Sequence, residues 1–252
     1  MVLTLWQFAI LCAAAAFGGF VDYIAGGGGI VTVRALLAVG MPPHLALGTN
    51  KLQASFGSLT AALNYRWGRM FSFRELTFGI AFTALGAIAG TITVQYISAD
   101  WLKHIITALL VLLFAYVLCK PDLGAIHKPS RLAPRIFYLL FGCLLGIYDG
   151  FFGPGTGSFW TMVFVLLLGF DLKKATAHTK VLNFTSNIVS LVTFMIGGHV
   201  VILVGLAMGI GQALGAYIGS HLVINRGTRF IRTFFLSVVA VTIAKLLWSA
   251  YG

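Results

Sequence analysis

The chain has 252 residues, of which 59% are hydrophobic and only 9% are charged, and its formal net charge at pH 7 is +11. Soluble domains carry roughly 25% charged residues, so the composition excludes a soluble globular protein and predicts an all-α, polytopic helical membrane protein. The basic residues stand at the ends of apolar runs rather than on one clustered face, which excludes nucleic acid as a partner and leaves membrane lipid.

A series of apolar runs predicts the membrane helices. The first run has no Lys or Arg before Arg34, so it lacks the charged region of a signal peptide, and we expect it to be a membrane helix. Most runs approach the ~20 residues that a span needs, whereas 28–39 and 156–168 are too short. We therefore predict about eight membrane helices, plus or including two broken short helices. Whether the short helices cross or re-enter stays open. The runs are 3–24, 28–39, 44–66, 74–97, 101–118, 134–150, 156–168, 174–196, 200–223 and 230–249.

The two halves of the sequence resemble each other. Residues 84–90 and 213–219 share the pattern Ala-Leu-Gly-Ala-x-x-Gly at an offset of 129 positions, and the same offset places Lys51 on Lys180. An offset of 127 places Asp22 on Asp149. Chance would not readily align both isolated acids and both isolated lysines in the same order. We therefore predict an internal duplication, with a first membrane repeat at 1–119, a cytoplasmic linker at 120–133 and a second membrane repeat at 134–252.

The distribution of charge predicts how each half is oriented. The basic loops are expected in the cytoplasm, which places both termini outside it and gives the two halves opposite orientations. Such inverted repeats are typical of secondary transporters, whose sites use discontinuous helices near the middle of the membrane. The basic segments are 66–74, 120–135, 173–174 and 226–232.

Asp22 and Asp149 each lie inside an apolar run. A carboxylate there costs roughly 2.5–3.5 kcal/mol on insertion scales, so by default it marks a pathway or a partner. One hypothesis is a gating or proton-coupling group beside a substrate. The other is a carboxylate that caps the neighbouring short helix or pairs with a lysine, and the two roles are compatible.

Glycine clusters follow both aspartates. They release backbone N–H groups where a short helix begins, and the N-terminus of a helix suits an anion. The alternative is a helix kink with close packing. Gly86, Gly90, Gly211, Gly215 and Gly219, by contrast, have the spacing of helix-packing glycines. The candidate anion-binding residues in the clusters are Gly26, Gly27, Gly28, Gly29, Gly153, Gly155 and Thr156.

Lys51 and Lys180 stand among polar neighbours, some of them three and four residues apart and so on one helix face. A lysine beside hydrogen-bond donors suits an oxyanion, although it could also only neutralise its aspartate. His178 could relay protons or make a local polar contact. The further candidate binding residues are Asn50, Lys51, Gln53, Thr179, Lys180, Asn183 and Asn187.

Several motifs resemble the TauE/SafE sulfite exporter family, also called the toluene-sulfonate uptake permease family. They are Asp22 with its glycines, Ala46-Leu-Gly-Thr-Asn-Lys51, Tyr148-Asp-Gly-Phe-Phe-Gly-Pro-Gly155 and Lys174-Ala-Thr-Ala-His178. The resemblance covers essentially the whole chain and is closest to an uncharacterised membrane-protein branch. It implies a multi-pass permease of the cell inner membrane for sulfite, sulfonates or related organosulfur anions. Arg34 stands where the family often has a proline, so it is a candidate modulator of the site. His178 is a second candidate modulator.

We therefore predict a secondary transporter, a permease or exporter, that carries such an anion by alternating access between the two repeats. A passive anion channel on the same scaffold is the alternative. We expect no enzyme, because the sequence has no His-Glu-x-x-His, Gly-x-Ser-x-Gly or metal-ligand cluster, and no cofactor or metal. Cys12, Cys119 and Cys143 have no paired spacing and predict no disulfide. Which anion is carried, in which direction, with which coupling ion and in which oligomeric state stays open.

Overall fold

The computed structural model describes residues 4–98, 100–101 and 130–251, and beyond Arg226 it describes the side chain of Phe234 only. Most of the apolar run 101–118, Cys119 and most of the linker 120–133 lie outside the described residues. All regular elements within the described ranges are helical. They are α1 (Leu5–Ala25), α2 (Gly28–Ala38), α3 (Pro43–Trp67), α4 (Phe73–Gln95), α6 (Pro134–Phe137), a π-helical turn (Tyr138–Gly142), α7 (Cys143–Phe151), α8 (Thr156–Leu167), α9 (Leu172–Ile196) and α10 (Ile202–Tyr251).

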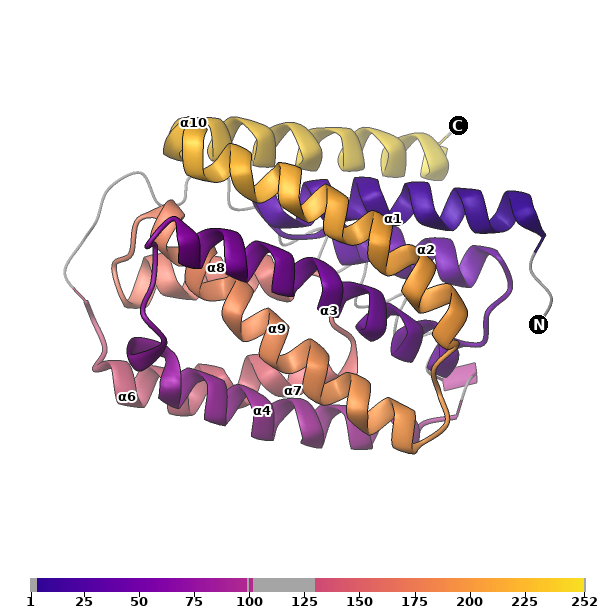
Figure 1. Cartoon of the computed structure of the whole chain (residues 1–252), viewed down its shortest axis with the longest axis horizontal. Helices are drawn as coiled ribbons and strands as arrows, with labels where there is room; N and C mark the ends of the chain where they lie inside the picture. The colour runs from indigo at the N-terminus through magenta and orange to yellow at the C-terminus, as the bar shows by residue number, and fades with distance from the viewer. Residues whose placement is uncertain (1–3, 99, 102–129, 252) are drawn as a thin grey trace.

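The predicted all-α, polytopic membrane fold is confirmed. Within the described residues, five helices are long and apolar enough to cross a membrane, and α2 and α8 are the expected short apolar helices. α6, the π-turn and α7 together form one span, Pro134–Phe151. Between the last two predicted runs we expected a loop; that segment is helical within α10, and the chain reverses direction at the upper left of Figure 1.

α3 and α9 lie between two other helix pairs, α1 with α10 and α4 with α7 (Figure 1). α3 and α9 run in opposite directions, because Gly48 near the start of α3 lies against Phe194 and His199 at the end of α9. These two helices carry the matched lysines of the two halves. Their antiparallel course is the relation that an inverted repeat requires.

Glycines bring the outer helix pairs into backbone contact. A Cβ atom at Gly86 or Gly90 of α4 would overlap the carbonyl oxygen of Cys143 or Ile147 in α7. In the other pair, Gly215 and Gly219 of α10 approach the carbonyl oxygens of Ala16 and Phe20 in α1 in the same way. The two sets are related by the sequence offsets of 129 and 127. Each half therefore packs its first helix on the last described helix of the other half, and the predicted packing role of these glycines agrees with the contacts.

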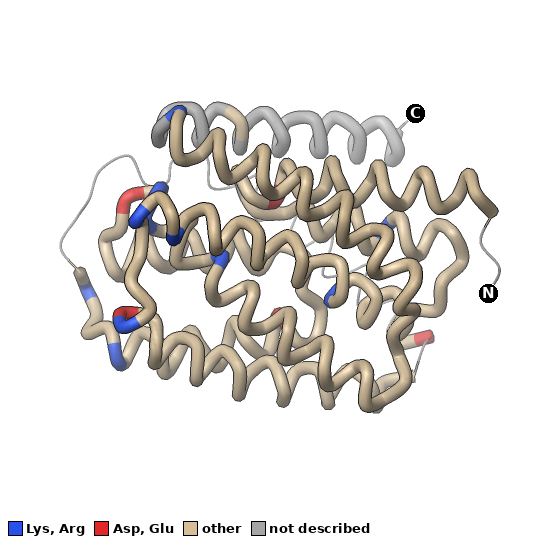
Figure 2. Tube along the Cα trace, viewed as in Figure 1, with Lys and Arg blue, Asp and Glu red and all other residues tan. Residues whose placement is uncertain are grey.

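The basic loops share one end of the bundle. Lys173, before α9, donates a hydrogen bond to the main-chain oxygen of Ile224 in α10 (2.8 Å), and Lys174 lies 3.7 Å from Glu75 at the start of α4. Arg135 of α6 lies over the ring of Phe78 in α4. Figure 2 shows Lys and Arg gathered at this end, on the left of the view, and the N-terminus at the other.

Candidate functional site

The two glycine breaks meet inside the bundle. α1 ends at Gly26 and α2 begins after Gly27, and their φ angles of +75° and +121° lie where L side chains rarely go. A Cβ atom at Gly26 would lie 2.7 Å from the main-chain nitrogen of Ser158 in α8, and one at Gly29 would lie 3.2 Å from Cα of Pro154. The starts of α2 and α8 therefore lie against each other and form one site from both halves.

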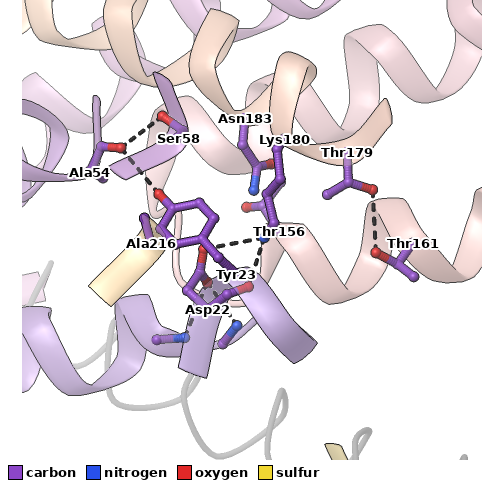
Figure 3. Close-up of polar contacts among 12 residues, drawn as sticks. Asp22, Tyr23, Ala54, Ser58, Thr156, Thr161, Thr179, Lys180, Asn183 and Ala216 are labelled. Carbon is purple, nitrogen blue, oxygen red and sulfur yellow. Dashed lines mark hydrogen bonds and ion pairs between the residues drawn. The ribbon is translucent and has the colours of Figure 1, made fainter. Parts of the chain in front are cut away.

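Asp22 caps the start of α2 and also pairs with a lysine. Its Oδ1 accepts hydrogen bonds from the N–H groups of Gly27 (2.9 Å) and Gly28 (3.1 Å). Lys180 of α9 donates to the main-chain oxygen of Asp22 (2.7 Å) and lies 3.3 Å from Oδ2. The ammonium group also lies 4.7 Å from the ring centre of Tyr23, as Figure 3 shows. Asp22 therefore makes both contacts of the cap-and-pair hypothesis.

Asp149 pairs with Lys51 of α3 in a more enclosed setting. The Lys51 ammonium donates to Oδ1 of Asp149 (2.6 Å) and to its main-chain oxygen, while the hydroxyl of Ser186 donates to Oδ2. The two side chains are 1% and 4% exposed, whereas Asp22 is 16% exposed. Each lysine thus pairs with the aspartate of the other half, and the four charges cancel.

Polar side chains on α3 and α9 continue the site on both sides. Asn50 accepts hydrogen bonds from Thr32 of α2 (2.7 Å) and Gln53 (2.8 Å). In the second half, Thr161 of α8 and Thr179 of α9 lie 3.2 Å apart. Thr156 donates to the main-chain oxygen of Gly153 (2.6 Å). Asn183 and Asn187 of α9 are buried as well. The structure thus gathers the predicted candidates on these helices into one buried polar region.

Two predicted candidates lie apart from the paired charges. His178 is buried among the rings of Phe71, Phe164 and Phe170, with its Nδ1 2.9 Å from the main-chain oxygen of Lys174 and its Nε2 3.5 Å from Glu75. These contacts belong to the basic end of the bundle and fit the local polar role. Arg34 is exposed on α2, whereas the buried residues of that helix are Gly28, Thr32, Val33 and Leu36.

Two residues of the site were not among the predicted candidates. Ser186 donates to Asp149, and the available signal was its place among the polar neighbours of Lys180, three residues after Asn183. Tyr23 packs its ring on the Lys180 ammonium and donates to the main-chain oxygen of Ala54 (3.3 Å). Its place directly after Asp22 was the available signal. Both side chains contact the paired charges directly.

A family model and several proteins described as membrane transporters match most of the chain. The family model described as "Sulfite exporter TauE/SafE" matches residues 11–246. The "Probable membrane transporter protein YfcA" of Escherichia coli K12 is 44% identical, covering 96% of this chain and 90% of its own length. A "Probable membrane transporter protein" of Haemophilus influenzae is 42% identical over 95% and 94%, and YdhB of Bacillus subtilis, with the same description, is 26% identical over 80% and 83%. No solved structure shows a significant match.

Proposed function

The chain belongs to the sulfite exporter TauE/SafE family of membrane transporters, and we propose that it is a secondary transporter for a small anion, such as sulfite, a sulfonate or a related organosulfur anion. The proposed route is alternating access in the inner membrane, with the basic loops in the cytoplasm and both termini outside it. The anion binds where the starts of α2 and α8 meet, beside Lys51 and Lys180. The crossed ion pairs between the two halves are the observation that carries this proposal.

The charge balance of the site supports coupling to protons. Two buried lysines and two aspartates sum to zero, so an entering anion leaves a net negative charge in a region of low dielectric constant. A proton on one carboxylate restores the balance. Asp22 is the better candidate of the two, because it is more exposed than Asp149 and its contact with the lysine is longer, 3.3 Å against 2.6 Å.

Transport into proteoliposomes tests the proposal. With an imposed proton gradient, the protein is expected to accumulate sulfite, sulfate, thiosulfate or a simple sulfonate above its external concentration, since a coupled transporter can work uphill. Asp22→Asn should retain the cap on α2 through its amide oxygen but lose the response to the gradient. Equilibration without accumulation would favour the passive anion channel, and no movement of any of these anions would contradict both.

Comparing a substitution of the exposed Arg34 with one of Lys180 distinguishes residues that bind the anion from charges that only lie nearby. Because Arg34 is exposed while the opposite face of α2 is buried, Arg34→Gln is expected to leave anion affinity within about twofold. Lys180→Gln should weaken it by about tenfold or more, as loss of a hydrogen bond to a charged group does. Titration of the purified protein with sulfite measures both variants. Equal losses in the two would place Arg34 in the site as a contact or modulator.

A further inference from the structure

The two halves differ at one position of the glycine breaks. Pro154 stands where the first half has Gly27, at the offset of 127. The N–H of Gly27 is one of the two that bind the Asp22 carboxylate, and proline has no N–H to offer. Asp149 accordingly accepts from Lys51 and Ser186 instead. The start of α2 is therefore closed by a carboxylate of the protein, and the start of α8 is not.

The start of α8 has an N–H group to spare. Its N-cap, Gly155, offers no side-chain hydrogen bond. The N–H groups of Thr156 and Ser158 bond to the main-chain oxygens of Gly153 and Gly155, whereas no acceptor for the N–H of Gly157 is found in the described part of the chain. Free N–H groups and the helix dipole both favour an anion at this place.

Asn183 supplies an independent sign of a ligand. Its side chain is 7% exposed, and its Oδ1 has no hydrogen-bond partner among the described residues. A Cβ atom at Gly157 would lie 3.2 Å from Nδ2 of Asn183 and 3.3 Å from Nζ of Lys180, so both side chains reach the start of α8 (Figure 3). Nδ2 is the end of the amide that faces the start of α8, so Asn183 already presents an NH₂ donor to an acceptor there. A buried amide without a hydrogen-bond partner destabilises the folded protein unless a ligand supplies that partner.

We propose that the anion-binding subsite is one-sided and lies at the start of α8, between the Gly157 N–H, Lys180 and Asn183. This inference rests on the proposed function and narrows it. The ligand is a small oxyanion that accepts from a main-chain N–H, an ammonium and an amide at once. The Lys180 ammonium has three N–H groups. Two of them donate to Asp22, which leaves one to donate to the anion. The matched position of Asn183 in the first half is Ala54, so the same three donors do not recur there.

The charges around the subsite are already paired within the protein. Lys180 faces the anion, but Asp22 lies behind that ammonium, and Asp149 with Lys51 lies beside Gly153 at the break. The anion is stabilised by the N-terminus of α8 and by hydrogen bonds, while the lysine charges are already balanced by the aspartates. Affinity then depends on the neutral donors as well as on Lys180, which makes Asn183 a specificity-determining residue.

Isosteric substitution at Asn183 tests the subsite. Asn183→Asp keeps the shape of the side chain and opposes an anion with a carboxylate, so we expect the affinity of the purified, full-length protein for sulfite and sulfate to fall at least tenfold. Asn183→Ala, the residue of the matched position, is the second variant and should lower affinity by about tenfold. Isothermal titration measures affinity, and gel filtration with thermal melting verifies folding.

Asn64→Asp is the matched control. Asn64 is also a buried amide, donating to Ser220 (2.8 Å), and lies roughly 20 Å along α3 from Lys51. Binding retained in this control but lost in both Asn183 variants supports the subsite. Unchanged binding in either folded Asn183 variant, or an equal loss in the control, overturns it. If the wild-type protein binds neither sulfite, sulfate, thiosulfate nor a simple sulfonate, the proposed function is overturned as well. That result differs from wild-type binding that is unchanged in the Asn183 variants, which overturns the subsite alone.

Discussion

Replacing Lys51 with methionine is expected to destabilise the protein by about 3–5 kcal/mol, because it leaves the Asp149 carboxylate buried without its charge partner. Three of the polar contacts in this cluster converge on Asp149: the ammonium of Lys51 reaches Oδ1 and the main-chain oxygen, and Ser186 reaches Oδ2. Removal of the ammonium leaves the hydroxyl alone to stabilise the charge. Unfolding of the purified protein in mixed detergent, followed by tryptophan fluorescence, measures the change.

A double variant and a surface control make this prediction specific. Lys51→Met combined with Asp149→Asn removes both charges and should recover most of the lost stability, since a neutral pair needs no counter-charge. Lys174→Met breaks a pair that is 37% and 53% exposed at 3.7 Å, and should cost less than about 1 kcal/mol. A double variant no more stable than the single one would mean that Lys51 acts through packing and not through its charge.

Alanine at the glycines of the helix crossings is expected to separate the outer helix pairs. The carbonyl oxygens facing Gly90 and Gly215 are main-chain atoms that cannot move without the helix that carries them. Overpacking of this kind costs about 1–3 kcal/mol and sometimes more, and van der Waals contact is the main force between helices in lipid. Gly90→Ala and Gly215→Ala should therefore both lower the melting temperature of the detergent-solubilised protein.

Gly68 provides the control for that prediction. It has an ordinary φ of −70°, and the nearest atoms to an added Cβ lie 3.5 Å away, so Gly68→Ala should leave the melting temperature within a few degrees. The two matched glycines belong to different halves, and each should show a similar loss. A large effect at one crossing and none at the other would contradict the equivalence of the two helix pairs.

The sequence alone was sufficient to predict the class of protein and to single out the four charged residues that the structure pairs. The length and apolarity of the runs predict the helices, because the thickness of a bilayer sets the length of a spanning segment and its apolar core requires internally hydrogen-bonded backbone. Asp22, Lys51, Asp149 and Lys180 stood out because charges in such runs are costly. The breaks at α2 and α8 followed from glycine clusters, which release backbone groups that a continuous helix would use.

The pairing of the charges could not be predicted in the same way. Spacing placed each lysine on a helix of its own half, and only the crossing of α3 and α9 decides that Lys180 meets Asp22 and Lys51 meets Asp149. The difference between the two breaks depends on the missing N–H of Pro154, which has meaning only once the capping contacts of Asp22 are known. Likewise, Glu75 and not the paired charges faces His178, because the direction of a side chain follows from packing.

The crossed ion pairs also have a consequence for biosynthesis. Asp22 and Lys180 are 158 positions apart in the sequence, and Lys51 and Asp149 are 98 apart. Ribosomes add roughly 5–20 residues per second, so Asp22 spends on the order of 8–30 s in a nascent chain before its lysine is synthesised. During that interval the first helices must remain inserted, or wait at the translocon, on the strength of their apolar residues alone. The capping bonds from Gly27 and Gly28 join residues that are close in the sequence, so they can form and stabilise the Asp22 carboxylate before Lys180 is synthesised.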